Sequence, residues 1–251
     1  MQPPKTDYQL EAMRKGGKIL AQIFADLKEQ IKPGVSELFL DRWVEHQIKK
    51  HGAIVTYKTP AINFPGAICI STNDKVVHGI PTKSFLKHGD VTSFDLVITY
   101  KGMNVDSAFT VVVGEDKPTG AKKHLLTTTE RALNAGIEQV KGTFHIGDVS
   151  AAIEGVLTRA KCGIVRDLAG HGIGEAVHMD PDIPNYGVKG RGRQVSPGDT
   201  ICIEPMVTLG EDAVVQEDDG WTFRTKDGSL AAHFEHTVLV TEYGYEILTT
   251  L

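Results

Sequence analysis

The chain contains few cysteines, and their positions exclude two common ways of stabilising a small fold. Only three of its 251 residues are cysteine, Cys69, Cys162 and Cys202, and no two of them form a CxxC pair. An odd number of widely spaced cysteines supports neither a disulfide framework nor a zinc ribbon. Each cysteine lies in an apolar stretch, so we expect buried thiols in a protein of a reducing compartment.

Long apolar segments and a basic surplus are also missing. No apolar run approaches the roughly 18 residues of a membrane span, and the N-terminal MQPPKTDYQLE has no signal-peptide core. The 27 basic residues are outnumbered by 32 acidic ones, and the net charge of −5 does not favour nucleic-acid binding. The short basic cluster from Lys189 to Arg193 is interpreted as a solvated loop. We expect a cytoplasmic protein with no membrane contact and no direct nucleic-acid partner.

No linker rich in proline, serine or charge divides the chain, so we predict a single domain over residues 1–251. The first helix is capped by Thr6 and Gln9 and stopped by Pro33-Gly34. Two helices followed by strands, twice over, predict a pseudo-twofold α+β fold in which helices cover one face of a mainly antiparallel sheet. The other expected elements are helices near 36–50, 122–140 and 146–161 and strands near 67–72, 91–100, 104–113, 164–168, 200–209 and 233–241.

Two aspartates flank an expected hairpin whose turn falls between Tyr100 and Gly102. A two-residue loop at 100–101 places Asp95 directly opposite Asp106, whereas a loop at 101–102 makes them diagonal neighbours. Both registers put the two carboxylates on one face, because side-chain direction alternates along a strand. Like charges so placed are destabilising unless a cation joins them, so the pattern predicts a metal site.

Three further acidic or imidazole side chains occur in comparable settings. Glu204 and Glu235 each interrupt an apolar strand, and a buried glutamate without a partner costs several kcal/mol or stays protonated. His171 lies between glycines, where the backbone can approach a ligand closely. With Asp95 and Asp106, these residues form the ligand set of a two-metal hydrolytic centre. The helix-borne zinc motif HExxH is missing from the sequence.

Segments spread over nearly the whole chain closely resemble the type I methionine aminopeptidases. All five candidate ligands have the residue types of that family, in the same order. The matching segments are TDYQLEAMRKGGKI, KPGVS, ICISTNDKVVHGIP, FDL, VDSAFTVVVG, GHGIG, IEPM, DGWTFRTKDGSLAAHFEHTVLVT and GYEILT. The resemblance implies the pita-bread metallopeptidase fold in a short, bacterial-type form.

The resemblance also implies the roles of the five ligands. Asp95 would chelate one divalent ion, His171 and Glu204 would bind a second, and Asp106 and Glu235 would bridge the two. A carboxylate-rich set with one imidazole suits Mn or Fe and accepts Co or Zn, which leaves the physiological metal open. Two such ions ~3.5–4 Å apart acidify a bridging water, and the resulting hydroxide would attack the first peptide carbonyl.

By the same resemblance, further residues would act on the substrate. Glu204 would pass a proton toward the leaving amine, and His178 would stabilise the tetrahedral oxyanion. Local sequence alone left His178 equally open to a structural role. His78, in VVHGIP, would contact the nitrogen side of the scissile bond.

The substrate's first side chain would enter a pocket lined by Phe64, Cys69 and Trp221. Two features depart from the family: Val177 replaces a bulky aromatic residue, and the segment 56–63, TYKTPAIN, differs from that of close relatives. A pocket discriminates only about 1–3 kcal/mol per methylene, so these departures bear directly on the preference for methionine.

The predicted activity is removal of the N-terminal methionine from nascent proteins by a monomeric metallo-exopeptidase. A broader-specificity pita-bread aminopeptidase is the first alternative. A proline-directed or creatinase-like relative would usually carry an additional N-terminal domain. A non-catalytic pita-bread binding protein is a further alternative, although such proteins typically lose metal ligands. Second-residue preference and ribosome docking are left open.

Overall fold

The computed structural model describes residues 4–251, so residues 1–3 of the predicted domain lie outside the described part. Its first two helices are α1, Asp7–Lys28, and α2, Glu37–Lys50. The predicted capping box is confirmed, because the Gln9 amide donates to the Thr6 side chain at 3.3 Å and the Thr6 amide donates to the Gln9 side chain at 2.9 Å. Helix α1 ends before Pro33-Gly34, because the backbone already turns at Glu29.

The second half contributes α3, Gly120–Ile137, and α4, Ile146–Ala160. Helix α4 agrees closely with its predicted range. Helix α3 begins two residues earlier and ends three residues earlier than 122–140. In the part of the chain that the structure describes, no helix is long and apolar enough to cross a membrane.

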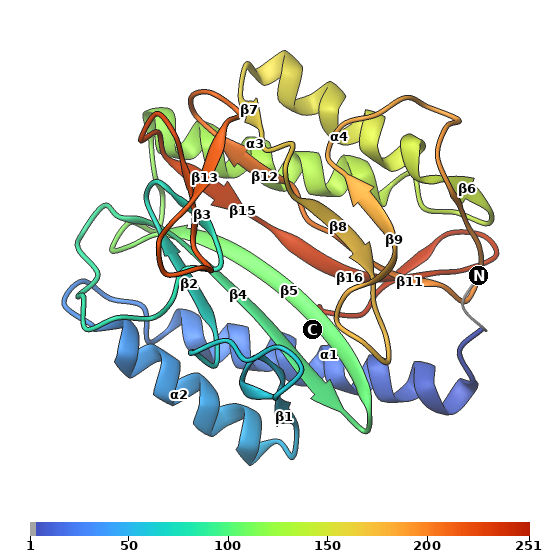
Figure 1. The fold of residues 1–251 in the computed structure, drawn as a ribbon, viewed down its shortest axis with the longest axis horizontal. Coiled ribbons are helices and arrows are strands. Elements are labelled where there is room, and N and C mark those ends of the chain that lie inside the picture. The colour runs from blue at the N-terminus through green and yellow to red at the C-terminus, as the bar shows by residue number, and fades with distance from the viewer. Residues whose placement is uncertain (1–3) are drawn as a thin grey trace.

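A nine-stranded antiparallel sheet runs through the centre of the molecule, with its strands in the order β1-β4-β5-β16-β11-β8-β9 (Figure 1). Strand β2 pairs with β4, and β17 pairs with β16. The bounds are β1 Ile54–Val55, β2 Cys69–Thr72, β4 Val91–Tyr100, β5 Met103–Val112, β8 Ala169–Gly172, β9 Met179–Pro184, β11 Thr200–Ile203, β16 Glu235–Val240 and β17 Tyr245–Ile247.

Shorter strands form three small sheets at the margins. They are β3 Lys75–Val77, β6 Phe144–His145, β7 Gly163–Ile164, β10 Gln194–Val195, β12 Met206–Thr208, β13 Val214–Gln216, β14 Phe223–Thr225 and β15 Ala231–His233. The predicted strand 164–168 survives only as β7, and 200–209 is split between β11 and β12. The split occurs at Glu204-Pro205, because proline has no backbone N–H for the ladder.

Two buried cores lie between the helices and the large sheet, one in each half of the chain. The first packs α1 and α2 against β4 and β5 through residues such as Leu20, Leu40 and Leu96. The second packs α3 and α4 against β11 and β16, for example through Leu133 and Ile201. The predicted arrangement, two helices covering each half of an antiparallel sheet, is confirmed (Figure 1).

Candidate metal centre

The register of the β4–β5 hairpin decides how the two aspartates lie. Asp95 pairs with Ala108 and Val97 pairs with Asp106, so the loop is Lys101-Gly102 and the carboxylates are diagonal neighbours on one face. Both loop residues have positive φ, 50° and 82°, as the common two-residue hairpin turn requires. The second of the two predicted registers is therefore the correct one.

The same ladder brings Glu235 to this face from the other half of the chain. Ala108 pairs with Asp95 on one side and with Glu235 of β16 on the other. Because paired residues point to the same side of a sheet, Asp95 and Glu235 flank the small Ala108 side chain. Asp106 lies two residues along β5 on that side. Oxygen atoms of these three carboxylates lie within 4.8 Å of one another.

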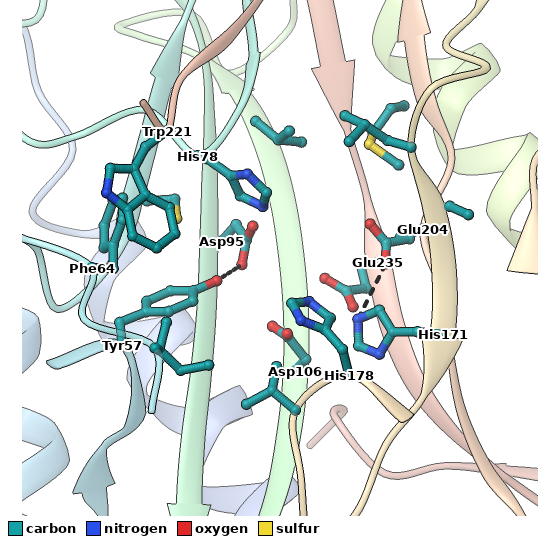
Figure 2. A pocket seen from close by; sticks show the side chains of 17 residues that line it. Tyr57, Phe64, His78, Asp95, Asp106, His171, His178, Glu204, Trp221 and Glu235 are labelled. Atoms are coloured by element: carbon teal, nitrogen blue, oxygen red, sulfur yellow. Dashed lines mark hydrogen bonds and ion pairs between the residues drawn. The ribbon is translucent and has the colours of Figure 1, made fainter. Parts of the chain in front are cut away.

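His171 and Glu204 close the cluster from β8 and from the end of β11. The His171 Nδ1 faces the Gly172 carbonyl oxygen at 3.0 Å, and its Nε2 lies 3.4 Å from Glu204 Oε1. A proton on Nδ1 leaves the Nε2 lone pair free for a metal ion, as is usual for metal-bound histidine. All five side chains of the predicted ligand set thus converge on one buried site, as Figure 2 shows.

The glycines beside His171 permit this approach. A side chain at position 170 would place its Cβ only 2.4 Å from the Cys202 carbonyl oxygen, and one at 172 would lie 2.3 Å from that of Asp180. Glycine therefore lets β8 lie between β11 and β9. Sequence reasoning treated GHGIG as a glycine-rich segment and did not predict strands β8 and β9.

The cluster is electrostatically unfavourable without a cation. Burial raises the pKa of Asp95 to about 6, and burial with repulsion from Glu235 and Asp95 raises that of Asp106 well above its usual range. The pKa values of Glu204 and Glu235 are also raised well above their usual range, first by burial and then by the neighbouring carboxylates. Asp106 Oδ1 and Glu235 Oε1 are buried and have no hydrogen-bond partner among residues 4–251. Divalent cations fit this donor set, because they would neutralise the charges and satisfy these oxygens.

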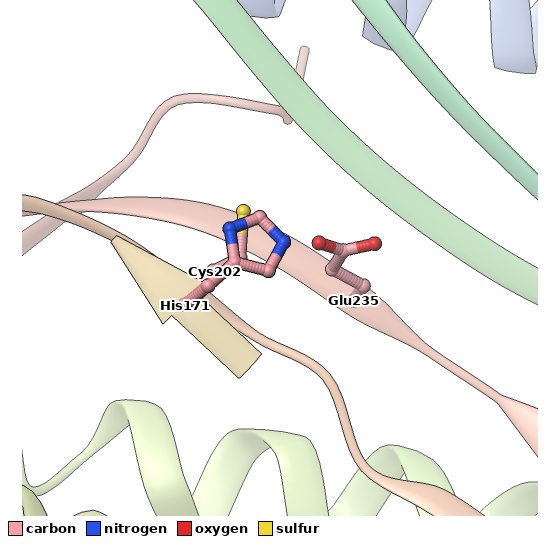
Figure 3. Close-up of side chains that lie close together, drawn as sticks. All are labelled: His171, Cys202 and Glu235. Carbon is pink, nitrogen blue, oxygen red and sulfur yellow. The ribbon is translucent and has the colours of Figure 1, made fainter. Parts of the chain in front are cut away.

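Burial lowers the pKa of His171 to about 4, with a further contribution from His178. The imidazole is therefore neutral near pH 7, as a metal ligand must be. Cys202 lies beside His171 and Glu235, and one ligand atom of each falls within 4.8 Å of the others (Figure 3). Burial raises the pKa of the Cys202 thiol well above its usual range, which keeps it protonated and disfavours it as a metal ligand, because the thiolate is the form that binds metal.

One histidine beside the cluster was missed by sequence reasoning. His233 is 1% exposed, and its Nε2 lies 3.6 Å from Glu204 Oε2 and 4.0 Å from Glu235 Oε2. Within the described part of the chain neither ring nitrogen of His233 has a hydrogen-bond partner, and burial lowers the pKa of this histidine to about 3. The sequence signal for His233 is its position in HFEHTV, two residues before Glu235. In a continuous strand that spacing would place both side chains on the same face.

A pocket of about 250 Å³ opens beside the carboxylates. The three predicted lining residues, Phe64, Cys69 and Trp221, form part of its wall. Tyr57 and Ile62 line it as well, from the segment 56–63 that departs from the family pattern. In Figure 2 the aromatic side chains gather on one side of the pocket, and His171, Glu204 and Glu235 lie on the other. This volume includes the space among the carboxylates, and it lies below the ~300–1,000 Å³ of pockets that take drug-sized ligands.

His78 and His178 both reach the space between the carboxylates and the pocket wall (Figure 2). The rings of His171 and His178 meet edge to face, with centroids 4.5 Å apart. Burial lowers the pKa of His178 and lowers that of His78 to about 4. His78 has a φ of 57°, and its carbonyl accepts a bond from the Thr222 hydroxyl at 3.3 Å. A left-handed non-glycine residue costs about 1–3 kcal/mol and is common at functional sites.

Comparisons with known proteins agree with this geometry. The profile of Metallopeptidase family M24 matches residues 11–242. Methionine aminopeptidase 1 of Bacillus subtilis is 41% identical over 245 residues, which cover 98% of each chain. The methionine aminopeptidase of Aquifex aeolicus is 40% identical over 252 residues, covering 97% of this chain and 96% of that one.

Solved structures extend the likeness to three dimensions. A methionine aminopeptidase from Thermotoga maritima superposes with a TM-score of 0.96 at 39% identity and full coverage of both chains. The prolidase from Pyrococcus furiosus shares the fold, with a TM-score of 0.78 at 22% identity over 99% of this chain and 65% of that one. From its sequence, its sheet topology and its central cluster of acids, the chain belongs to metallopeptidase family M24 and has the pita-bread fold.

Proposed function

We propose that this protein is a methionine aminopeptidase, which hydrolyses the first peptide bond of chains that begin with methionine. One observation carries the proposal: four carboxylates and one imidazole line one side of a pocket whose other side is apolar and aromatic. The full-length similarity to proteins named methionine aminopeptidase supports the same activity. The whole of residues 1–251 would act as one catalytic domain.

The proposed metal ligands are those of the central cluster. Asp95 would help to hold one ion and His171 and Glu204 the other, with Asp106 and Glu235 as further ligands. Two divalent ions bound there would neutralise the carboxylates and supply an acidified water near neutral pH. Membership of a metallopeptidase family supports the use of divalent metal, and we propose Mn, Fe, Co or Zn as the candidates.

Three side chains would act directly on the peptide. Glu204, at the strand break, would accept a proton and deliver it to the leaving amine. His178 would donate a hydrogen bond to the carbonyl oxygen as negative charge develops there. Its lowered pKa keeps the ring neutral, and a neutral ring still carries one N–H donor. His78, across the pocket, would contact the nitrogen side of the bond.

The preference for methionine would come from the shape and chemistry of the pocket. Phe64 and Trp221 meet edge to face with ring centroids 5.3 Å apart, and Cys69 and Val177 complete an apolar surface. Such a wall matches a flexible thioether, which gains from contacts between sulfur and aromatic rings. We propose a monomer that acts in the cytoplasm on the N-termini of newly made chains.

A panel of peptides that differ only in their first residue tests the proposal. Each peptide is assayed with protein loaded with Mn, Fe, Co or Zn, and release of the first residue is measured. Methionine should be released with the highest kcat/KM. Faster release of another first residue would replace the proposed substrate and keep the reaction class, whereas no release with any metal would refute the enzyme itself.

A further inference from the structure

Tyr57 connects the metal cluster to the apolar pocket. It lies in the short 3-10 helix Thr56–Lys58 and is 8% exposed. Its hydroxyl donates a hydrogen bond of 2.6 Å to Asp95 Oδ1, as the dashed line in Figure 2 shows. Its ring belongs to the same buried cluster as Phe64, Cys69 and Val177. The residue thus contacts a proposed metal ligand with one end and the pocket with the other.

The position of Tyr57 is fixed by its surroundings. Its carbonyl oxygen accepts a bond from the Phe64 amide at 2.8 Å, and the two rings lie 5.3 Å apart. The preceding Thr56 hydroxyl bonds to that of Thr99 on β4 at 2.8 Å. The 3-10 helix is therefore tied to the strand that carries Asp95, so that the phenol and the carboxylate share one rigid support.

We propose that Tyr57 is a positioning and specificity-determining residue, whose hydroxyl orients Asp95 for metal binding and whose ring forms the pocket wall beside Val177. The part that concerns the ring rests on the proposed aminopeptidase function. The part that concerns the hydroxyl rests only on the metal cluster. Neither role follows from the ligand set, because that set consists of four carboxylates and one imidazole and does not include Tyr57.

The Tyr57 hydroxyl acts by restricting the orientation of the Asp95 carboxylate through their hydrogen bond. Bonds to a charged acceptor are about twice as strong as neutral ones, and outer partners of metal ligands typically contribute 10–100-fold to metal affinity. With Oδ1 held by the phenol, the orientation of the carboxylate plane is set before an ion arrives. A ligand already in its bound orientation loses less conformational entropy on binding.

The ring compensates for the small side chain at position 177. Val177 and Tyr57 line the same pocket, on which Phe64 and Trp221 also border. A valine leaves space that a large residue would fill, and the phenol supplies aromatic surface to the same wall. The ring of Tyr57 therefore supplies aromatic surface that the small side chain at position 177 does not.

The hydroxyl is tested by Tyr57→Phe, with Tyr243→Phe as the matched control, because Tyr243 is 96% exposed. Mn²⁺ alone is titrated into the metal-free proteins by calorimetry. Tyr57→Phe should bind Mn²⁺ about 10-fold more weakly or worse, while KM for a methionyl peptide at saturating metal stays unchanged because the ring remains. The control should bind as the wild type does. Wild-type affinity in Tyr57→Phe would refute the orienting role.

The ring is tested by Tyr57→Leu, alone and combined with Val177→Phe. The single change should raise KM for a methionyl peptide about 10-fold, since it removes aromatic contacts of the bound side chain. The second change restores aromatic volume and should return KM toward the wild type, and it also serves if Tyr57→Leu alone folds poorly. An unchanged KM in Tyr57→Leu, or no recovery of KM in the double variant, would refute the role of the Tyr57 ring in the pocket wall. A wild-type protein that releases no methionine would instead refute the proposed function, and the Mn²⁺ titration would still decide the role of the hydroxyl.

Discussion

Replacing Asp95 by asparagine should stabilise the metal-free protein at neutral pH. Asparagine keeps the size of the side chain and can still accept the bond from Tyr57, but it carries no charge. Burial is the main cause of the raised Asp95 pKa, so the folded state without metal holds this carboxyl at a disadvantage. The substitution removes that disadvantage together with a proposed ligand.

The magnitude follows from the shift in pKa. A rise from 3.8 to about 6 is about two units, and at about 1.36 kcal/mol per unit it destabilises the folded, ionised protein by about 3 kcal/mol. Because the folded-state pKa is raised, the destabilisation is absent below the unfolded value of 3.8 and complete above about 6. For a chain of this length, 3 kcal/mol corresponds to a Tm difference of about 6–12 °C.

Denaturant unfolding of the chelator-treated proteins at about pH 5 and about pH 7.5 measures the effect. The stability of Asp95→Asn relative to wild type should grow by about 1.5 kcal/mol between these two pH values. Taking the difference cancels the titration of groups that do not interact with Asp95, whereas Asp106, Glu204 and Glu235 lose its repulsion in the variant and add to the effect in the same direction. Asp116→Asn, at an exposed position, is the control and should give a flat difference. A pH-independent difference for Asp95→Asn would show that burial does not raise the pKa of this carboxyl.

Three further predictions concern the site. Asp106→Asn and Glu235→Gln should each abolish peptide hydrolysis and reduce the bound metal measured by mass spectrometry; full metal content with no turnover would remove the bridging role. His178→Ala should keep its metal and lose about 10²–10³ in kcat, and unchanged turnover would exclude it from the mechanism. Burial lowers the pKa of His233 to about 3, so the folded protein loses stability as pH falls below the unfolded value of 6.5. The free energy of unfolding of metal-free His233→Leu should therefore rise relative to wild type by about 2 kcal/mol between about pH 7 and pH 5. An equal loss of stability in both proteins over this range would contradict the prediction.

The alternation of side chains along strands was sufficient to predict much of the site. It placed Asp95 and Asp106 on one face for either loop, and the structure differs only in which loop was used. The loop at 101–102 requires a positive φ at both Lys101 and Gly102. Only Gly102 favours that conformation, so the sequence did not decide between the two loops. The apolar contexts of Glu204 and Glu235 predicted buried acids, because such residues are rarely tolerated without a partner.

Other features depend on contacts that no local pattern encodes. Strands β8 and β9 exist because Gly170 and Gly172 let three backbones lie together, and such pairing is set by distant segments. The hydroxyl of Tyr57 finds Asp95 only after the 3-10 helix has packed on β4. His233 faces Glu204 across a break at Phe234 that the apolar strand pattern does not reveal.

Because Ala108 pairs with both Asp95 and Glu235, the metal cluster forms only when β4, β5 and β16 pair in this register. Strands β5 and β16 come from opposite halves of the chain, and a slip of one residue would point His236 inward and turn Glu235 toward the helices. A misregistered molecule could keep most of its secondary structure and yet lack the Glu235 carboxylate, a proposed metal ligand. The amount of tightly bound metal per protein chain would then measure the fraction of molecules in which β5 and β16 had paired in the correct register.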